Sequence, residues 1–249
     1  MTGAWPSPCP SAAEPEGIIV TVAKFVYLQP QSRSGMLTLA EAGKVADSLR
    51  NGSLAVLPTE TGHMLAALAT NMKAVDCAFT VKGRPSANVM HVACASLQMA
   101  EQVGVIDQLA IRLLGELTPG PVTVVVKKTP LLPDRLVALD GTVGIRIPDH
   151  PATLQVINAV GAPVTATSLN STGSAAEPLA TLDLQALNWP ESGVVHIVKD
   201  DGAIAYGSPS TLVRITSGSP EILRQGPVPE SEIQRVAGLP SYLELTDAT

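Results

Sequence analysis

The chain has 249 residues, of which 22 are acidic and 16 are basic, so its formal net charge is −6. This length suffices for one domain with a substantial core, and the acidic balance disfavours binding of nucleic acid or an anionic membrane through net charge. The three cysteines are odd in number and lack metal-type spacing, so we expect free thiols in a reducing, cytoplasmic environment.

The two ends of the chain differ in composition from the rest. Residues 1–16 are rich in Pro, Ser and Ala and are expected to be disordered, because they cannot bury enough apolar surface to become ordered. Residues 239–249 are expected to form a frayed C-terminal tail. Between them, residues 17–238 alternate helical periodicity with short strands rich in Val and Ile, which predicts a single α/β domain with a largely buried sheet.

The first predicted elements place polar residues at a strand end. A helix is predicted over Leu39–Arg50, followed by a strand over Leu54–Leu57 that runs into Pro58. Thr59, Glu60 and Thr61 come next, and ligands of open α/β sheets bind at strand ends. Glu60 is the middle residue of an extended segment, so its side chain is expected to point away from those of the two threonines.

Two cations follow the next predicted helix. Residues 71–81 have helical spacing, and Lys82 and Arg84 follow before Pro85 ends the helix. A polyanion such as a triphosphate needs full positive charges together with short hydroxyl or amide donors. The simpler alternative is that the two cations only complement the helix dipole, worth about 0.3 to 1 kcal/mol each.

The remaining elements continue the alternation, and polar residues again follow a strand. Ser168 and Asn170 follow the strand predicted over residues 163–166 and are the short donors that complement Lys82 and Arg84. Strands are predicted over residues 89–95, 122–126, 143–147, 163–166, 194–198 and 210–215, and helices over 97–103, 106–114 and 152–160.

Two further groups of polar residues are the pair Arg146 and Asp149 and the four histidines. Arg146 and Asp149 could bind a substrate, or they could form an ion pair that holds a turn. The four histidines are not within one helical turn of each other, so no metal site is expected. His91 and His196 lie inside apolar strands, so we expect their imidazoles to be hydrogen-bonded in the core rather than to act as metal ligands.

Seven segments in this order resemble one known family. They are P-T-E-T, K-G-R-P, T-P-G-P-V-T, V-G-I-R-I-P-D-H-P, T-S-L-N, S-T-L-V and I-L-R-Q-G, and they look like the YrdC-like threonylcarbamoyl-AMP synthases from about Leu39 to Val228. The resemblance implies an α/β fold, with a twisted mixed sheet flanked by helices around a wide concave cleft. It also implies ATP-dependent synthesis of threonylcarbamoyl-AMP from L-threonine and bicarbonate, with release of pyrophosphate, for threonylcarbamoyladenosine modification of tRNA.

The resemblance also implies roles for individual residues. Lys82, Arg84, Ser168 and Asn170 match the signature that grips ATP, and we take them as the catalytic set. Other positions match the family's nucleotide contacts (Asn88, Thr123, Arg224) or its threonine pocket (Thr61, Ala166, Ser210, and His63 and Lys127 in place of an aromatic residue and an arginine). Mg²⁺ is expected to be held mainly by the phosphates, because this ion keeps most of its water.

The chain departs from the family pattern around the amino-acid end, at His63, Met64, Ala93 and Lys127. Two enzymatic hypotheses follow: the protein uses threonine in a rebuilt pocket, or it makes a carbamoyl-adenylate from another amine in specialised metabolism. A third hypothesis is a noncatalytic RNA-binding module, which the acidic balance disfavours. The expected partner of an enzyme is a downstream tRNA-modifying transferase.

Overall fold

The computed structural model describes residues 26–31, 33–82, 89–169, 193–200, 202, 204–206, 208–215 and 218–238. Both ends of the chain lie outside these ranges, as do the predicted site residues Arg84, Asn88 and Asn170. The helices of the described part are α1 (Leu39–Arg50), α2 (Met72–Val81), α3 (Leu97–Val103), α4 (Gln108–Leu117), α5 (Pro151–Val160), α6 (Glu230–Ala237) and the 3-10 helix η1 (Asp134–Leu136).

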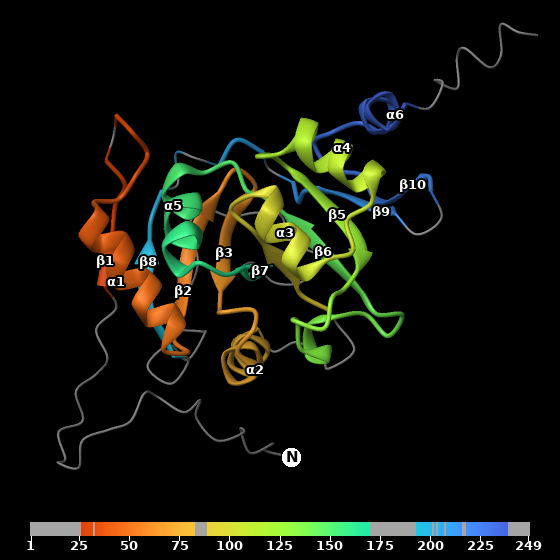
Figure 1. Cartoon of the computed structure of the whole chain (residues 1–249). Helices are drawn as coiled ribbons and strands as arrows, with labels where there is room; N and C mark the ends of the chain where they lie inside the picture. Colours follow the sequence, from red (N-terminus) through yellow and green to blue (C-terminus); the bar gives the residue numbers. More distant parts are fainter. Residues whose placement is uncertain are drawn as a thin grey trace, which may run out of the picture.

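The strands of the described part form one mixed sheet in the order β1-β8-β2-β3-β7-β4-β6-β5-β9-β10. They are β1 (Val26–Leu28), β2 (Leu54–Thr59), β3 (Gly62–Ala66), β4 (His91–Ala93), β5 (Val122–Lys127), β6 (Thr142–Arg146), β7 (Val164–Ser168), β8 (Val194–Val198), β9 (Thr211–Ile215) and β10 (Pro220–Arg224). The sheet is strongly twisted and flanked by helices (Figure 1). The predicted α/β class is therefore confirmed.

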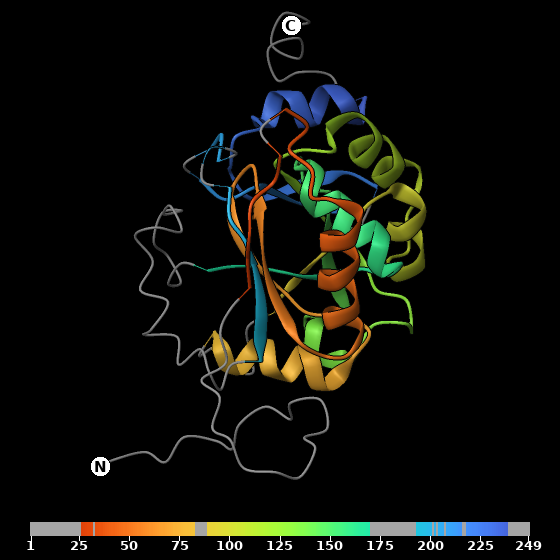
Figure 2. The same cartoon turned by 90° about the vertical axis from the view of Figure 1, so that its left-hand side faces the viewer.

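Strand β7 joins the two halves of the sheet. It pairs antiparallel with β3 on one side and with β4 on the other, so segments that are distant in sequence become neighbours at its end. Helices α1, α3, α4 and α5 lie on one face of the sheet, whereas α2 and α6 lie near opposite ends of the molecule (Figure 2). The inner strands β2 and β6 are wholly buried, which is typical of a sheet covered by helices, whereas the edge strands β1 and β10 are largely exposed.

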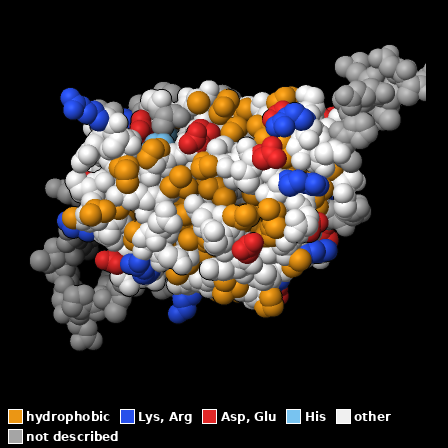
Figure 3. Space-filling model, turned by 45° about the horizontal axis from the view of Figure 1, so that its top comes forward, with side chains coloured by type: hydrophobic (Ala, Val, Ile, Leu, Met, Phe, Trp, Pro, Cys, Tyr) orange, Lys and Arg blue, Asp and Glu red, His pale blue; other side chains and the backbone are white. Residues whose placement is uncertain are grey.

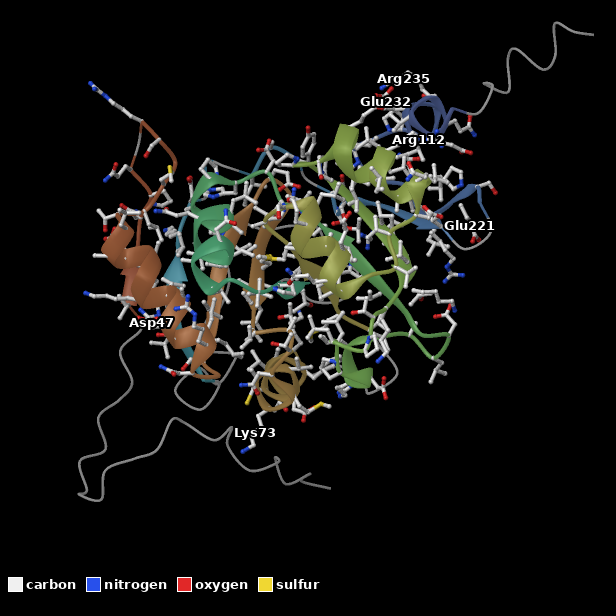
Figure 4. The ribbon with its side chains drawn as sticks, in the orientation of Figure 1. Asp47, Lys73, Arg112, Glu221, Glu232 and Arg235 are labelled. Carbon is white, nitrogen blue, oxygen red and sulfur yellow. The ribbon has the colours of Figure 1, made fainter. Side chains whose placement is uncertain are left out.

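Helix α6 is tied to α4 by charged side chains. Arg112 of α4 donates a hydrogen bond to the Ala237 carbonyl at 3.2 Å, and Arg235 lies 3.5 Å from Glu116. Arg235 also pairs with Glu232 at 2.7 Å within α6 (Figure 4). These contacts fix the chain just after β10.

Local signals predicted several elements well, and tertiary contacts account for the differences. The limits of α1 and α3 are as predicted, and α1 begins with the capping box of Thr38 and Glu41. The prediction missed β1, β3, β10, α6 and the 3-10 helix η1. The expectation of three free thiols is wrong for Cys77, which is disulfide-bonded, because sequence spacing does not reveal which side chains meet. No helix in the described ranges is long and apolar enough to cross a membrane.

Candidate functional site

The hairpin between β2 and β3 forms the first part of the site. Residues 60 and 61 form a turn rather than extended strand. Thr59 Oγ1 donates to the Gly62 carbonyl at 2.6 Å, and the Thr61 N–H donates to Thr59 Oγ1 at 3.2 Å. Because the backbone turns here, the alternation of a strand does not apply to Glu60 and Thr61.

A buried ion pair holds this turn. Arg146 Nη2 donates to Glu60 Oε1 at 2.5 Å, and Arg146 Nη1 donates to Thr61 Oγ1 at 3.1 Å. The Asp149 N–H donates to the other carboxylate oxygen of Glu60 at 2.9 Å. The prediction that Glu60 points away from Thr61 is therefore wrong, since both side chains meet the same guanidinium. The carboxylate that pairs with Arg146 is that of Glu60, not that of Asp149.

Strand β5, the residue before β9 and the end of β10 contribute the second part. Thr123 Oγ1 and Ser210 Oγ are 2.7 Å apart, and both residues are buried. Arg224 donates from Nε and Nη2 to the Ser210 carbonyl at 3.2 and 2.9 Å. The pKa of Arg224 is lowered, first by burial and then by the positive charge of Arg146. Arg146 and Arg224 are therefore close enough to interact, which brings the two parts together.

The two guanidinium groups of this cluster have different partners. Arg146 is neutralised by Glu60, whereas in the described part of the chain the hydrogen bonds of Arg224 go to Ser210. Arg224 is an exposed residue at the end of β10, so its guanidinium is accessible to a carboxylate or phosphate oxygen.

The end of β7 forms the third part. Ala166 pairs with His91 at the start of β4, and Ser168 pairs with Met64 of β3. Ser168 is exposed and Ala166 is partly buried. Lys82 caps the C-terminus of α2. Strand β4, the first described strand after Lys82, therefore lies beside β7, the strand that ends at Ser168.

Gly144 links the third part to the second. A Cβ built at this glycine would lie 2.7 Å from His91 Cδ2 and 3.0 Å from Thr123 Cγ2. The missing side chain therefore allows the His91 ring and Thr123 to approach each other across β6. His91 is partly exposed rather than a core residue. His196 is buried, but its Nδ1 makes no hydrogen bond among the described residues.

Two predicted threonine-site residues lie away from this cluster. His63 pairs with Pro58 on β2, and strand alternation directs its side chain to the face opposite that of Met64 and Ser168. There it accepts a hydrogen bond from the Asp200 N–H at 3.4 Å. Lys127 is exposed at the far end of β5, four residues or about 13 Å along the strand from Thr123, and its Nζ donates to the Asp140 carbonyl at 2.5 Å.

The donor set suits an anion better than a metal ion. Within the described ranges no group of three or more His, Cys, Asp or Glu side chains could hold a metal. Both carboxylate oxygens of Glu60 are already hydrogen-bonded. The sequence analysis underrated Glu60 and Arg146; the available signal was a charged residue directly after the apolar strand β2 and another as the last residue of the apolar strand β6.

Comparison with known proteins agrees with this architecture. Residues 47–226 match the Sua5/YciO/YrdC family model, which is described as "Telomere recombination". The threonylcarbamoyl-AMP synthase of Pyrococcus abyssi is 33% identical over 196 residues, and that of Bacillus subtilis is 32% identical over 201 residues. These alignments cover 78% and 80% of this chain but only 56% and 57% of the two relatives.

A solved structure of P. abyssi Sua5 in complex with L-threonine superposes with a TM-score of 0.74 at 27% identity. The match covers 86% of this chain and 61% of that one. Family model, sequence relatives and fold agree, and the chain belongs to the Sua5/YciO/YrdC family.

Proposed function

We propose that the protein is a threonylcarbamoyl-AMP synthase that uses ATP, bicarbonate and L-threonine and releases pyrophosphate. The names of the two relatives and the threonine bound to the related Sua5 support this assignment. The observation that carries it is the arrangement in which Arg146 donates to Thr61, Arg224 donates to Ser210, and the two guanidinium groups influence each other electrostatically. These are the groups needed to hold an amino acid's anionic end next to a phosphate.

The reaction needs two bond-forming steps. The neutral amine of threonine adds to carbon dioxide derived from bicarbonate and loses a proton, which gives a carbamate. A carbamate oxygen then attacks the α-phosphorus of ATP, and the bond between the α-phosphorus and the bridging oxygen breaks as pyrophosphate leaves. Negative charge accumulates on the departing phosphates, so fixed cationic and neutral donors lower the barrier.

In this proposal Lys82, Arg84, Ser168 and Asn170 bind the phosphates and are the catalytic set. Removing one such donor commonly costs about 2.7 to 4 kcal/mol of barrier. The remaining roles are nucleotide contact for Asn88, Thr123 and Arg224, and threonine contact for Thr61, Ala166 and Ser210. His63 and Lys127, whose side chains lie away from the cluster, receive no role in this proposal. Arg224 and Ser210 touch each other, which suits a junction between nucleotide and amino acid.

Positioning supplies most of the catalysis in this proposal. Glu60, the carboxylate nearest Thr61 in the described cluster, is held as a counterion by Arg146 and by the Asp149 N–H, so it is not arranged as a general base. Holding the carbamate against the α-phosphorus can contribute up to about 7 to 11 kcal/mol in favourable cases. We propose that Mg²⁺ arrives with ATP and stays on its phosphates.

The chemistry of the product defines the next partner. A carbamic–phosphoric mixed anhydride is an activated acyl donor, so a transferase that moves the threonylcarbamoyl group to a tRNA adenosine would consume it. The face shown in Figure 3 carries interspersed acidic and basic side chains rather than a continuous basic patch. Because RNA binding usually requires a continuous basic surface, this face does not support the RNA-binding alternative.

The test is release of pyrophosphate from purified protein supplied with ATP, bicarbonate and one amino acid at a time. Release that requires all three, with threonine preferred, supports the proposal. Release with a different amine in place of threonine would identify the alternative carbamoyl-adenylate synthase. No release with any amine, together with tight RNA binding, would refute an enzymatic role.

A further inference from the structure

The turn between β2 and β3 restricts where hydroxyl protons can point. A hydroxyl has one proton to donate and two lone pairs that accept. Thr59 Oγ1 donates its proton to the Gly62 carbonyl at 2.6 Å, so this oxygen can only accept from its other neighbours. Those neighbours are the Thr61 N–H and Thr61 Oγ1, each at 3.2 Å.

Arg146 then fixes the role of Thr61. A guanidinium has donors and no acceptor, so at 3.1 Å Arg146 Nη1 donates and Thr61 Oγ1 accepts. The proton of Thr61 is therefore free to point only toward Thr59 Oγ1 or toward a bound ligand. When this proton points toward a ligand, Thr59 Oγ1 still accepts a hydrogen bond from the Thr61 N–H. The backbone turn therefore keeps its hydrogen bond to Thr59 Oγ1.

Glu60 holds Arg146 in the geometry that this requires. Its carboxylate is nearly fully buried and bonds Arg146 on one oxygen and the Asp149 N–H on the other. The Glu60 carbonyl also accepts the N–H groups of Ala205 and Tyr206 at 2.9 and 3.0 Å. One residue thus connects the hairpin, the end of β6 and the segment that leads to Ser210.

We propose that Glu60 and Arg146 are positioning residues that hold the Thr61 hydroxyl as a hydrogen-bond donor, and that this hydroxyl receives a carboxylate oxygen of the amino-acid substrate. This inference deepens the proposed function and rests on it. The neighbouring Arg146 guanidinium polarises the Thr61 O–H bond, which strengthens its hydrogen bond to an anionic acceptor. An ammonium group would instead meet the positively charged guanidinium of Arg146, which already donates to this hydroxyl.

The test compares threonine with threoninamide, which lacks the carboxylate charge. The wild-type full chain is assayed for binding of each compound by calorimetry and for KM and kcat in pyrophosphate release. The variants are Thr61→Val, Arg146→Lys and Glu60→Gln, with Glu221→Gln as a control that removes an exposed carboxylate on β10. Melting temperatures show whether each variant is folded.

The wild type and the Glu221→Gln control are expected to prefer threonine by about tenfold or more, the usual size for a hydrogen bond to a charged group. Thr61→Val and Arg146→Lys should lose most of that preference. Glu60→Gln should raise the KM for threonine while the KM for ATP stays within about twofold, a split that general destabilisation does not produce. If Glu60→Gln does not fold, Arg146→Lys and Thr61→Val carry the test.

The outcomes separate this inference from the proposed function. Absence of pyrophosphate release by the wild type with every amine counts against the proposed function. Unchanged selectivity in folded Thr61→Val and Arg146→Lys overturns the inference even in an active enzyme. Equal binding of threonine and threoninamide by the wild type, or no binding of either, overturns it as well.

Discussion

Gly226 follows β10 and lies directly against the segment that carries Ser210. A Cβ built at this glycine would lie 2.3 Å from Thr211 N, 2.5 Å from the Pro209 carbonyl oxygen and 2.6 Å from Ser210 C. All three are backbone atoms, so no side-chain rotation relieves the overlap. Since real Cβ atoms essentially never come within 3.0 Å of such neighbours, Gly226→Ala requires the two segments to separate by about 0.7 Å.

That displacement is large for this site. Catalytic groups must usually be held within about 0.5 Å of productive geometry, and a misplacement of about 1 Å can cost about 10²-fold in rate. We expect kcat/KM for pyrophosphate release to fall by about ten- to a hundredfold. Overpacking should also lower the free energy of unfolding by about 1 to 3 kcal/mol, which for a domain of this size lowers Tm by about 2 to 12 °C.

The assay combines calorimetric Tm with steady-state pyrophosphate release. The matched control is Gly115→Ala in α4, where an added Cβ meets nothing within 4 Å. This exposed helical position should gain up to about 1 kcal/mol of stability and keep wild-type kinetics. Wild-type Tm and kcat/KM in Gly226→Ala would show that the Ser210 segment is not constrained as described.

Three further outcomes are expected. Gly144→Ala should lower Tm by less than Gly226→Ala, because a Cβ there meets the end of the His91 ring and a threonine methyl group rather than backbone; a larger loss would contradict this. His150 is buried, and desolvation lowers its pKa from 6.5, so the stability it contributes is present above about pH 6.5 and is lost as pH falls through its lower folded pKa. The drop in Tm between pH 7 and pH 5 should therefore be smaller in His150→Gln, and equal drops would refute the assignment. Lys82→Ala and Arg84→Ala should each abolish pyrophosphate release without lowering Tm, whereas wild-type turnover in both would rule out the phosphate role.

Much of the fold follows from local signals. The capping box of Thr38 and Glu41 and the helical spacing that follows define α1 without any tertiary contact. In contrast, β10 is a short edge strand with exposed residues, and α6 is a helix whose docking depends on α4. A short edge strand such as β10 carries weak periodicity, because its stability comes from its neighbour rather than from its own sequence. Helix α6 is amphipathic, with Ile233, Val236 and Ala237 buried at helical spacing, so its pattern was present in the sequence and only its docking required the tertiary structure.

The sequence by itself determined the order of the motifs, the α/β class and the presence of Thr61 and Ser210 at strand ends. Only the tertiary structure decided that Arg146 pairs with Glu60 across 86 residues, and that Thr61 shares the same guanidinium. The physical reason is the turn at Glu60, which cancels strand alternation and lets two consecutive side chains reach one partner. Ion pairs between distant segments leave no periodic trace in a sequence, so the geometry of the site became visible only once the sheet had brought β2, β6 and β9 together.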